Sequence, residues 1–287
     1  MVEQVPSAYR RPVGDLVVTA LGDGYIEIGL DYLSNIEASE AKALLTKNFH
    51  SPSPRSSVNA YAVQGKGRTV LIDTGAGGGM GPTMGHFLRN LGAAGIAPDS
   101  VDAVVLTHMH PDHIGGLVDG NGRANFPRAE LFVPEAETRF WLDEATASGA
   151  PEAFRPYFQA AKAAADAYRD RLRVFSGTAV LPGIEAVPLP GHTPGHTGYR
   201  IGTGREQVLH WADTVHVPDL QLERPEICIA FDNDPAQAEA TRRRVLDMAA
   251  NESLVVIGGH LHFPAFSHIV RVGNAYRLVP EAWHHVI

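Results

Sequence analysis

The chain has 287 residues, of which 44% are hydrophobic and 20% charged, as is usual for a globular protein with a large core. The formal net charge of −8 and a single dense basic run, residues 242–244, argue against a nucleic-acid-binding protein. One cysteine, Cys228, excludes an internal disulfide. We see no signal peptide and no apolar run approaching the ~20 residues of a membrane span. We therefore expect one cytoplasmic domain, residues 1–287, that binds no membrane.

The first part of the chain predicts strands and one short helix. Residues 13–28 alternate in polarity and predict a hairpin around Gly22-Asp23-Gly24. Residues 38–45 predict a short helix, and residues 58–63 and 69–72 predict paired strands.

A glycine-rich loop, residues 75–81, follows the second of these strands. It lacks the Gly-Lys-Ser/Thr ending of a phosphate-binding loop, and its spacing does not fit a dinucleotide fingerprint. We expect it instead to bring backbone close to a neighbouring loop. Residues 82–91 predict a helix with Pro82 in its first turn.

The rest of the chain alternates between predicted strands and predicted helices. Strands are expected at residues 101–106, 129–133, 172–175, 184–187, 197–201, 208–211, 254–257, 268–272 and 275–278. Helices are expected at residues 134–147, 151–169 and 235–250. This order predicts an α+β fold in which two mixed sheets pack together with helices outside.

The segment from His108 to His113 holds three imidazoles and a carboxylate within six residues, directly after the predicted strand at 101–106. Imidazole and carboxylate groups suit Zn, Fe, Mn or Co. A loop whose histidines cap a helix or face water would not need four ligand groups so closely spaced. The segment therefore predicts a metal site on a loop.

Three later places offer further ligands, each after a predicted strand. They are His192 with His196, then Asp213, then His260. Each alone has an ordinary alternative, because a lone histidine after a strand is usually a polar loop residue and an aspartate there is often a helix cap. Together with the histidine-rich loop they indicate a binuclear site.

These residues resemble the signature of the metallo-β-lactamase superfamily, a His-x-His-x-Asp-His loop followed by later His, Asp and His ligands. The resemblance implies an αβ/βα sandwich with two divalent metal ions per chain, Zn by default and Fe, Mn or Co as alternatives. It assigns His108, His110 and His192 to one ion, Asp112, His113 and His260 to the second, and Asp213 to both. His196 then has a supporting role, and Asp73 either contacts a ligand histidine or caps a turn.

Further pieces are similar to the methyl parathion hydrolase branch with its lactonase and aryl esterase relatives. They include residues 70–76, 81–83, 140–142, 191–197 and 276–280. This resemblance implies a homodimeric hydrolase of lactones and aryl esters, with a metal-bridging hydroxide as nucleophile and promiscuous phosphotriesterase activity. The sequence lacks a Gly-x-Ser-x-Gly elbow, which argues against a serine hydrolase. The rival functions are a dedicated organophosphate hydrolase and a mononuclear iron oxidoreductase, and the full second ligand set argues against the latter.

His216 lies three residues after Asp213 and has two interpretations. It either donates a catalytic hydrogen bond to a carbonyl or tetrahedral oxygen, which favours esters and lactones, or it is an exposed loop residue. The candidate substrate-pocket residues are Met80, Trp141, Phe154, Phe231 and His262. Ordinary core packing is the alternative for the apolar ones. A pocket of this composition suits a small uncharged ester or lactone.

Overall fold

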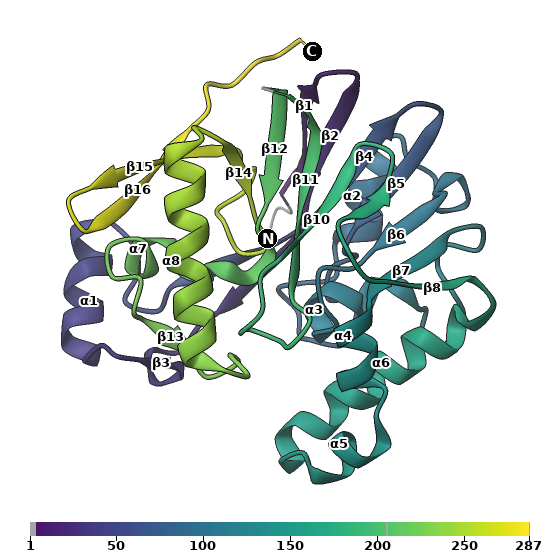
Figure 1. Cartoon of the computed structure of the whole chain (residues 1–287), viewed down its shortest axis with the longest axis horizontal. Coiled ribbons are helices and arrows are strands. Elements are labelled where there is room, and N and C mark those ends of the chain that lie inside the picture. Colours follow the sequence, from purple (N-terminus) through teal and green to yellow (C-terminus); the bar gives the residue numbers. More distant parts are fainter. Residues whose placement is uncertain (1–3, 205, 287) are drawn as a thin grey trace.

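Two seven-stranded mixed β-sheets pack against each other, with helices on their outer sides (Figure 1). The structure is a computed structural model and describes residues 4–204 and 206–286. The first sheet has, in spatial order, β1 (Ala8–Val13), β2 (Leu16–Glu27), β4 (Arg55–Gly65), β5 (Arg68–Ile72), β6 (Ala103–Val105), β7 (Glu130–Pro134) and β8 (Leu172–Phe175). The predicted sandwich of two mixed sheets is confirmed.

The second sheet closes the other side of the core. Its spatial order is β16 (Ala275–Pro280), β15 (Ser267–Val272), β14 (Val255–Ile257), β12 (Glu206–His210), β11 (Thr197–Thr203), β10 (Ile184–Pro188) and β9 (Ala179–Leu181). A separate pair joins β3 (Leu33–Ser34) to β13 (Cys228–Ile229). The helices are α1 (Ala38–Lys47), α2 (Phe87–Ala93), α3 (Pro111–Ile114), α4 (Glu135–Trp141), α5 (Glu144–Gly149), α6 (Arg155–Ala167), α7 (Pro218–Gln221) and α8 (Pro235–Asn251).

The alternation of residues along β4 explains how one strand serves two cores. Tyr61 and Val63 belong to the cluster between the sheets, whereas Ala60 and Ala62 belong to the cluster that includes residues of α2 and α6. Successive side chains of a strand point to opposite faces, so a strand covered on both faces is apolar throughout. Each large apolar side chain buried in this way contributes roughly 1.5–3 kcal/mol.

The prediction of a hairpin around Gly22-Asp23-Gly24 is wrong. Strand β2 runs through this segment with only a register shift, and the turn lies earlier, between β1 and β2. The reason is tertiary, because the buried Asp23 carboxylate accepts hydrogen bonds from the backbone N–H groups of Ala76, Gly85 and Phe87. Gly24 allows the loop that contains Thr83 to pack against β2, since a Cβ on Gly24 would lie 1.9 Å from the backbone oxygen of Thr83.

Two helix predictions need correction at their ends. The helix expected over residues 82–91 begins only at Phe87, so Pro82 is not in its first turn. The helix expected over residues 134–147 is divided into α4 and α5, because the Asp143 carboxylate accepts the N–H of Thr146 and starts a new helix. The other expected helices and strands are present with shifts of a few residues at their ends.

The glycine-rich loop behaves as expected for close backbone packing. A Cβ on Gly115 would lie 2.1 Å from the backbone oxygen of Ala76, and one on Gly116 would lie 2.1 Å from that of Thr74. Side chains at these glycines would separate the two loops. The loop after β5 therefore lies directly against the turn that follows the histidine-rich segment.

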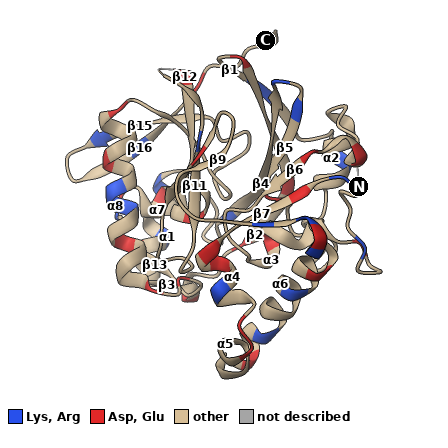
Figure 2. Cartoon of the chain, turned by 45° about the vertical axis from the view of Figure 1, so that its right-hand side comes forward, with Lys and Arg blue, Asp and Glu red and all other residues tan. Residues whose placement is uncertain are grey.

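Acidic and basic residues are interspersed over the surface elements, and α8 carries both kinds (Figure 2). Within residues 4–204 and 206–286, none of the helices combines the length and the apolar character that crossing a bilayer requires.

Candidate metal centre

The seven ligand-type residues lie in segments that follow strands of both sheets, with Asp112 and His113 in the short helix α3. The histidine-rich segment follows β6, whereas His192, Asp213 and His260 follow β10, β12 and β14 of the other sheet. Strands β12 and β14 are parallel, so the segments after them leave the sheet at the same edge. Residues far apart in sequence thus meet at one end of the sandwich.

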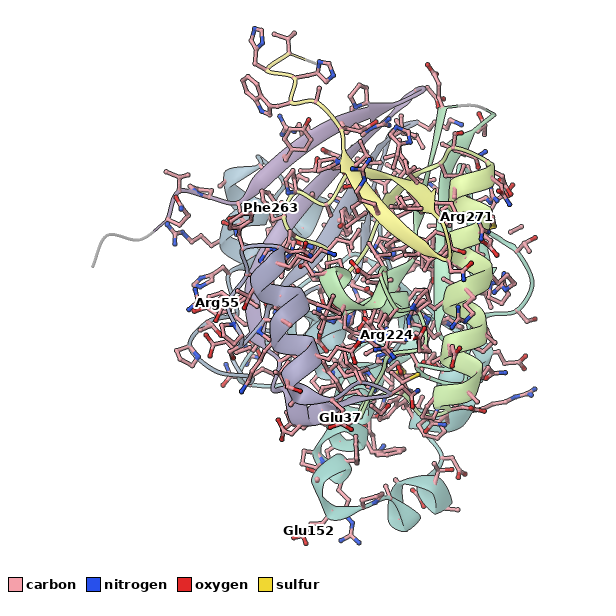
Figure 3. All side chains as sticks on the ribbon, turned by 90° about the vertical axis from the view of Figure 1, so that its left-hand side faces the viewer. Glu37, Arg55, Glu152, Arg224, Phe263 and Arg271 are labelled. Carbon is pink, nitrogen blue, oxygen red and sulfur yellow. The ribbon has the colours of Figure 1, made fainter. Side chains whose placement is uncertain are left out.

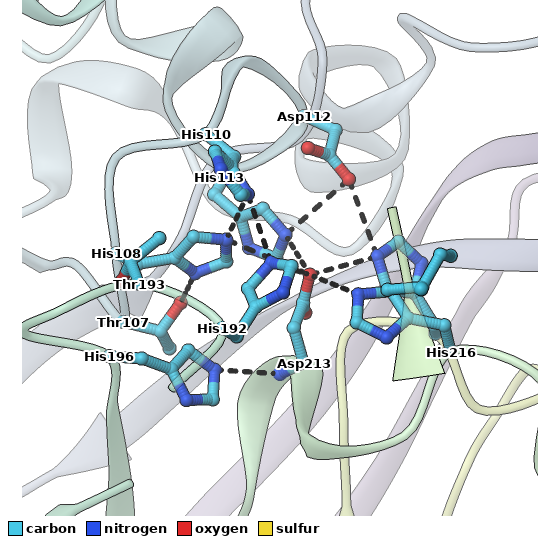
Figure 4. Close-up of polar contacts among 12 residues, drawn as sticks. Thr107, His108, His110, Asp112, His113, His192, Thr193, His196, Asp213 and His216 are labelled. Atoms are coloured by element: carbon cyan, nitrogen blue, oxygen red, sulfur yellow. Dashed lines mark hydrogen bonds and ion pairs between the residues drawn. The ribbon is translucent and has the colours of Figure 1, made fainter. Parts of the chain in front are cut away.

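Three histidines form the first cluster (Figure 4). The Nδ1 atom of His110 lies 3.1 Å from Nε2 of His108 and 2.9 Å from Nε2 of His192. All three side chains are buried. Three imidazole nitrogens facing one point form a ligand set that could hold a divalent ion.

Two carboxylates and two histidines form the second cluster. The Oδ2 atom of Asp213 lies 3.1 Å from Nε2 of His113 and 3.0 Å from Nε2 of His260. Both imidazoles lie 3.4 Å from Oδ2 of Asp112. The structure thus brings together the group expected at the second ion.

Asp213 connects the two clusters. Its Oδ2 atom also lies 3.7 Å from Nε2 of His108 and 3.5 Å from Nε2 of His192. Its other oxygen, Oδ1, is buried and has no hydrogen-bond partner among the described residues. A buried carboxylate with an unpaired oxygen is costly unless a cation compensates it, so the position suits a group shared by two ions.

The two clusters differ in the pKa values of their histidines. Burial lowers the pKa of His108 and His110 well below the usual histidine value. Burial alone would raise the pKa of Asp213, but His113, His260 and His108 bring it well below its usual value. The neighbouring carboxylates Asp213 and Asp112 instead raise the pKa of His113 and His260. The first cluster therefore offers neutral imidazoles, whereas in the second cluster a divalent ion would replace the protons on the two imidazoles as the partner of the ionised carboxylates.

Asp73 is the hydrogen-bond partner of a ligand-type histidine, which decides between its two expected roles. Its carboxylate lies 2.8 Å from Nδ1 of His113 and accepts the backbone and hydroxyl hydrogens of Thr107. Thr107 in turn contacts Nδ1 of His108 at 2.9 Å. Such contacts fix the ring orientation and the tautomer of metal-binding histidines.

His196 supports the site without joining either cluster. Its Nδ1 donates to the backbone oxygen of Leu189, and its Nε2 accepts the backbone N–H of Asp213 at 3.0 Å. This pattern fixes the tautomer of the ring, and burial lowers its pKa to about 3. His196 therefore positions the backbone from which the shared carboxylate extends.

Asp232 was not anticipated from the sequence. Its Oδ1 lies 2.9 Å from Nδ1 of His192, and its Oδ2 accepts the backbone N–H of Ile229. The fully buried Arg242 of α8 lies 3.7 Å away and donates to three backbone oxygens. No spacing pattern links Asp232 to His192, which lies 40 residues earlier, so the sequence carries no signal for this contact.

Glu137 of α4 is the second unanticipated residue. Its fully buried carboxylate accepts the backbone N–H of Met109 and the indole N–H of Trp141 through Oε2. Through Oε1 it accepts the hydroxyl of Thr193 and the backbone N–H of Gly195. Met109 lies between two ligand-type histidines and Thr193 follows a third, so Glu137 joins both ligand loops.

His216 is buried, so the exposed-loop alternative is wrong. Its Nε2 lies 3.5 Å from Oδ2 of Asp213, and its ring stacks on His260 with the centroids 5.0 Å apart. The Gln221 side chain accepts its backbone N–H, and Ser56 donates to its backbone oxygen. His216 is thus held rigidly beside the two clusters.

A cavity of about 400 Å³ adjoins the first cluster. His110 and His192 line it together with Trp141, Phe154 and Phe231, three of the expected pocket residues. Phe158, for which core packing was the expected role, is buried against Trp141 and also reaches this wall.

Two expected pocket residues do not line this cavity. Met80 packs partly buried against Val58, Ala76 and Met84. His262 is half-exposed and turns towards another carboxylate, Asp219. The structure therefore places both side chains away from the aromatic wall.

Comparisons with known proteins agree with this geometry. The profile of the metallo-beta-lactamase superfamily matches residues 53–260. The hydrolase AbOPH in the beta lactamase superfamily is 31% identical, with a TM-score of 0.92 over 98% of this chain and 100% of that chain. AidC, a dizinc quorum-quenching lactonase solved with a product N-hexanoyl-L-homoserine, is 26% identical, with a TM-score of 0.92 over 99% and 100%.

Among curated proteins, a probable metallo-hydrolase of Mycobacterium tuberculosis is 29% identical over 137 residues, 45% of this chain. The match spans only 41% of that relative's length. The family profile, in contrast, includes every ligand-type residue of both clusters. The chain belongs to the metallo-beta-lactamase superfamily.

Proposed function

We propose that this protein is a metal-dependent hydrolase of lactones and aryl esters. The observation that carries the proposal is the convergence of two ligand clusters on Asp213 beside an aromatic-walled cavity. Small-molecule sites are typically apolar cavities with a few convergent polar groups. The cavity volume of about 400 Å³ falls in the range of such sites.

In this proposal the two clusters hold two divalent ions, by default Zn. One ion binds His108, His110 and His192, the second binds Asp112, His113 and His260, and Asp213 binds both. When bound, such ions lower the pKa of a shared water and polarise the ester carbonyl. No protein nucleophile is then required.

The remaining site residues bind and orient the substrate. Burial lowers the pKa of His216 to about 4, so its imidazole is neutral near pH 7. A neutral imidazole keeps one N–H, and we assign it the donation of a hydrogen bond to the substrate's carbonyl oxygen. Trp141, Phe154 and Phe231 receive the apolar part of the substrate.

The structural relatives support this substrate class. AidC is a dizinc lactonase with a homoserine product bound, and AbOPH is a hydrolase, and both share the fold over almost the whole chain. An uncharged acyl or aryl group suits the aromatic wall, because burying a charge there without a partner is costly.

The decisive experiment compares kcat/KM of the zinc-loaded enzyme on three substrates: N-hexanoyl-homoserine lactone, dihydrocoumarin and paraoxon. We expect the two lactones to be preferred and paraoxon to be hydrolysed slowly. A preference for paraoxon by several orders of magnitude would instead establish a dedicated organophosphate hydrolase. One iron per chain together with oxygen consumption would refute hydrolysis as the main activity.

A further inference from the structure

A third group of metal-type side chains lies outside the two clusters of the candidate metal centre. It consists of His50, Asp219 and His262. The Oδ2 atom of Asp219 lies 3.3 Å from Nε2 of His50 and 3.4 Å from Nε2 of His262. The two imidazole rings are stacked, with centroids 5.0 Å apart and planes 14° from parallel. Both imidazoles therefore approach the same carboxylate oxygen.

The three side chains come from separate parts of the chain. His50 follows α1, Asp219 belongs to α7, and His262 lies in the loop after β14. Figure 3 labels Phe263, the residue after His262, beside α1. Asp219 and His262 line a cavity of about 860 Å³, as do Lys47 and Asn48, which precede His50. The three residues therefore gather where three backbone segments meet.

The geometry matches that of the candidate metal centre itself. There, imidazole nitrogens lie 3.0 to 3.7 Å from the carboxylate oxygen of Asp213. In the group of His50, Asp219 and His262 the corresponding distances fall within this range. The three ligand atoms all lie within 4.8 Å of one another, so small side-chain rotations bring them around one ion.

No Lys or Arg of the described residues forms an ion pair with Asp219. Among the described residues, its carboxylate has these two imidazoles as its side-chain partners. Lys47, which lines the same cavity, is 3.3 Å from Glu223 instead. The side chains of His50 and His262 are 39% and 45% exposed, so an ion and a completing water can reach them from solution.

We propose that His50, Asp219 and His262 bind a third divalent cation of the zinc class, separate from the dinuclear centre. Two imidazoles, one carboxylate and one water complete a tetrahedral zinc site. Imidazole nitrogens also favour Co²⁺ and Ni²⁺ over Mg²⁺ or Ca²⁺. The bound cation links the end of α1 and α7 to the loop that carries His260.

The test counts zinc on the intact protein by equilibrium dialysis against a series of buffered free-zinc concentrations. The wild-type chain is expected to bind one equivalent more at saturation than the H50A/H262A double variant. D219N, which keeps the shape of the side chain, is expected to weaken the same equivalent. The test measures the difference in bound zinc between the wild type and the variants. Its outcome therefore does not depend on hydrolytic activity or on how many ions the dinuclear centre holds.

The matched control is H268A. His268 is similarly exposed and lies 3.9 Å from the carboxylate of Glu281, but no second histidine shares that carboxylate in the described structure. Cadmium-113 NMR gives an independent readout, because the extra ion should add one resonance that H50A/H262A lacks and H268A keeps. Equal zinc binding and equal spectra for the wild type and H50A/H262A would overturn the proposal, as would the same loss in H268A.

Discussion

Replacing Glu137 by glutamine tests whether one buried carboxylate holds both ligand loops in place. Glutamine keeps the size of the side chain but has one acceptor oxygen in place of two. Four donors converge on this carboxylate in the native protein. If the new amide NH2 group takes the place of Oε1, it faces the Thr193 hydroxyl and the backbone N–H of Gly195. The hydroxyl can rotate and accept a hydrogen bond from the amide, but the N–H of Gly195 can only donate.

The least costly orientation of the amide therefore leaves one buried N–H, that of Gly195, without an acceptor. An unsatisfied buried donor costs about 1–3 kcal/mol. We therefore expect the free energy of unfolding of E137Q to be lower than that of the wild type by this amount. Each kcal/mol lost corresponds to a decrease of roughly 2–4 °C in Tm. Because the weakened contact adjoins the His192 loop, we also expect metal affinity to fall roughly 10–100-fold.

Differential scanning calorimetry and zinc competition with a chromophoric chelator measure the two effects. E135Q is the matched control, because Glu135 lies on the same helix but forms an exposed ion pair with Arg139. Such a pair contributes about 0.3–0.5 kcal/mol. If E137Q melted and bound zinc like E135Q, the assignment of Glu137 as the link between the loops would be refuted.

Other changes address the remaining parts of the site. D73N removes an acceptor from His113, and zinc affinity measured by chelator competition should fall roughly 10–100-fold. G116A places a Cβ 2.1 Å from a backbone oxygen and should abolish soluble expression, whereas G120A meets nothing within 4 Å and should express normally. H216A should lower kcat for a lactone about 10²-fold at unchanged zinc content, and an unaltered kcat would remove His216 from catalysis. A chelator should lower Tm in calorimetry, because ions that bind only the folded chain stabilise it, and added zinc should restore Tm.

The sequence predicts those features that depend on local patterns. Alternating polarity marks the strands, and ligand types packed into the segment from His108 to His113 mark the centre before any fold is known. Asp232 and Glu137 could not be predicted, because each reaches a ligand loop only through tertiary packing. The direction of the His262 side chain could not be predicted either, because this residue lies in a loop and its contact with Asp219 depends on tertiary packing.

The contacts that form the centre join distant parts of the chain, as the pairs His110 with His192 and His113 with Asp213 are separated by 82 and 100 residues. Contacts of such long range form slowly and late in folding. A newly synthesised chain thus cannot complete either ligand cluster until the second sheet has docked on the first. Co-expressed halves divided before β9 should regain high-affinity zinc binding only on reassembly, which makes zinc uptake a direct assay of docking between the sheets.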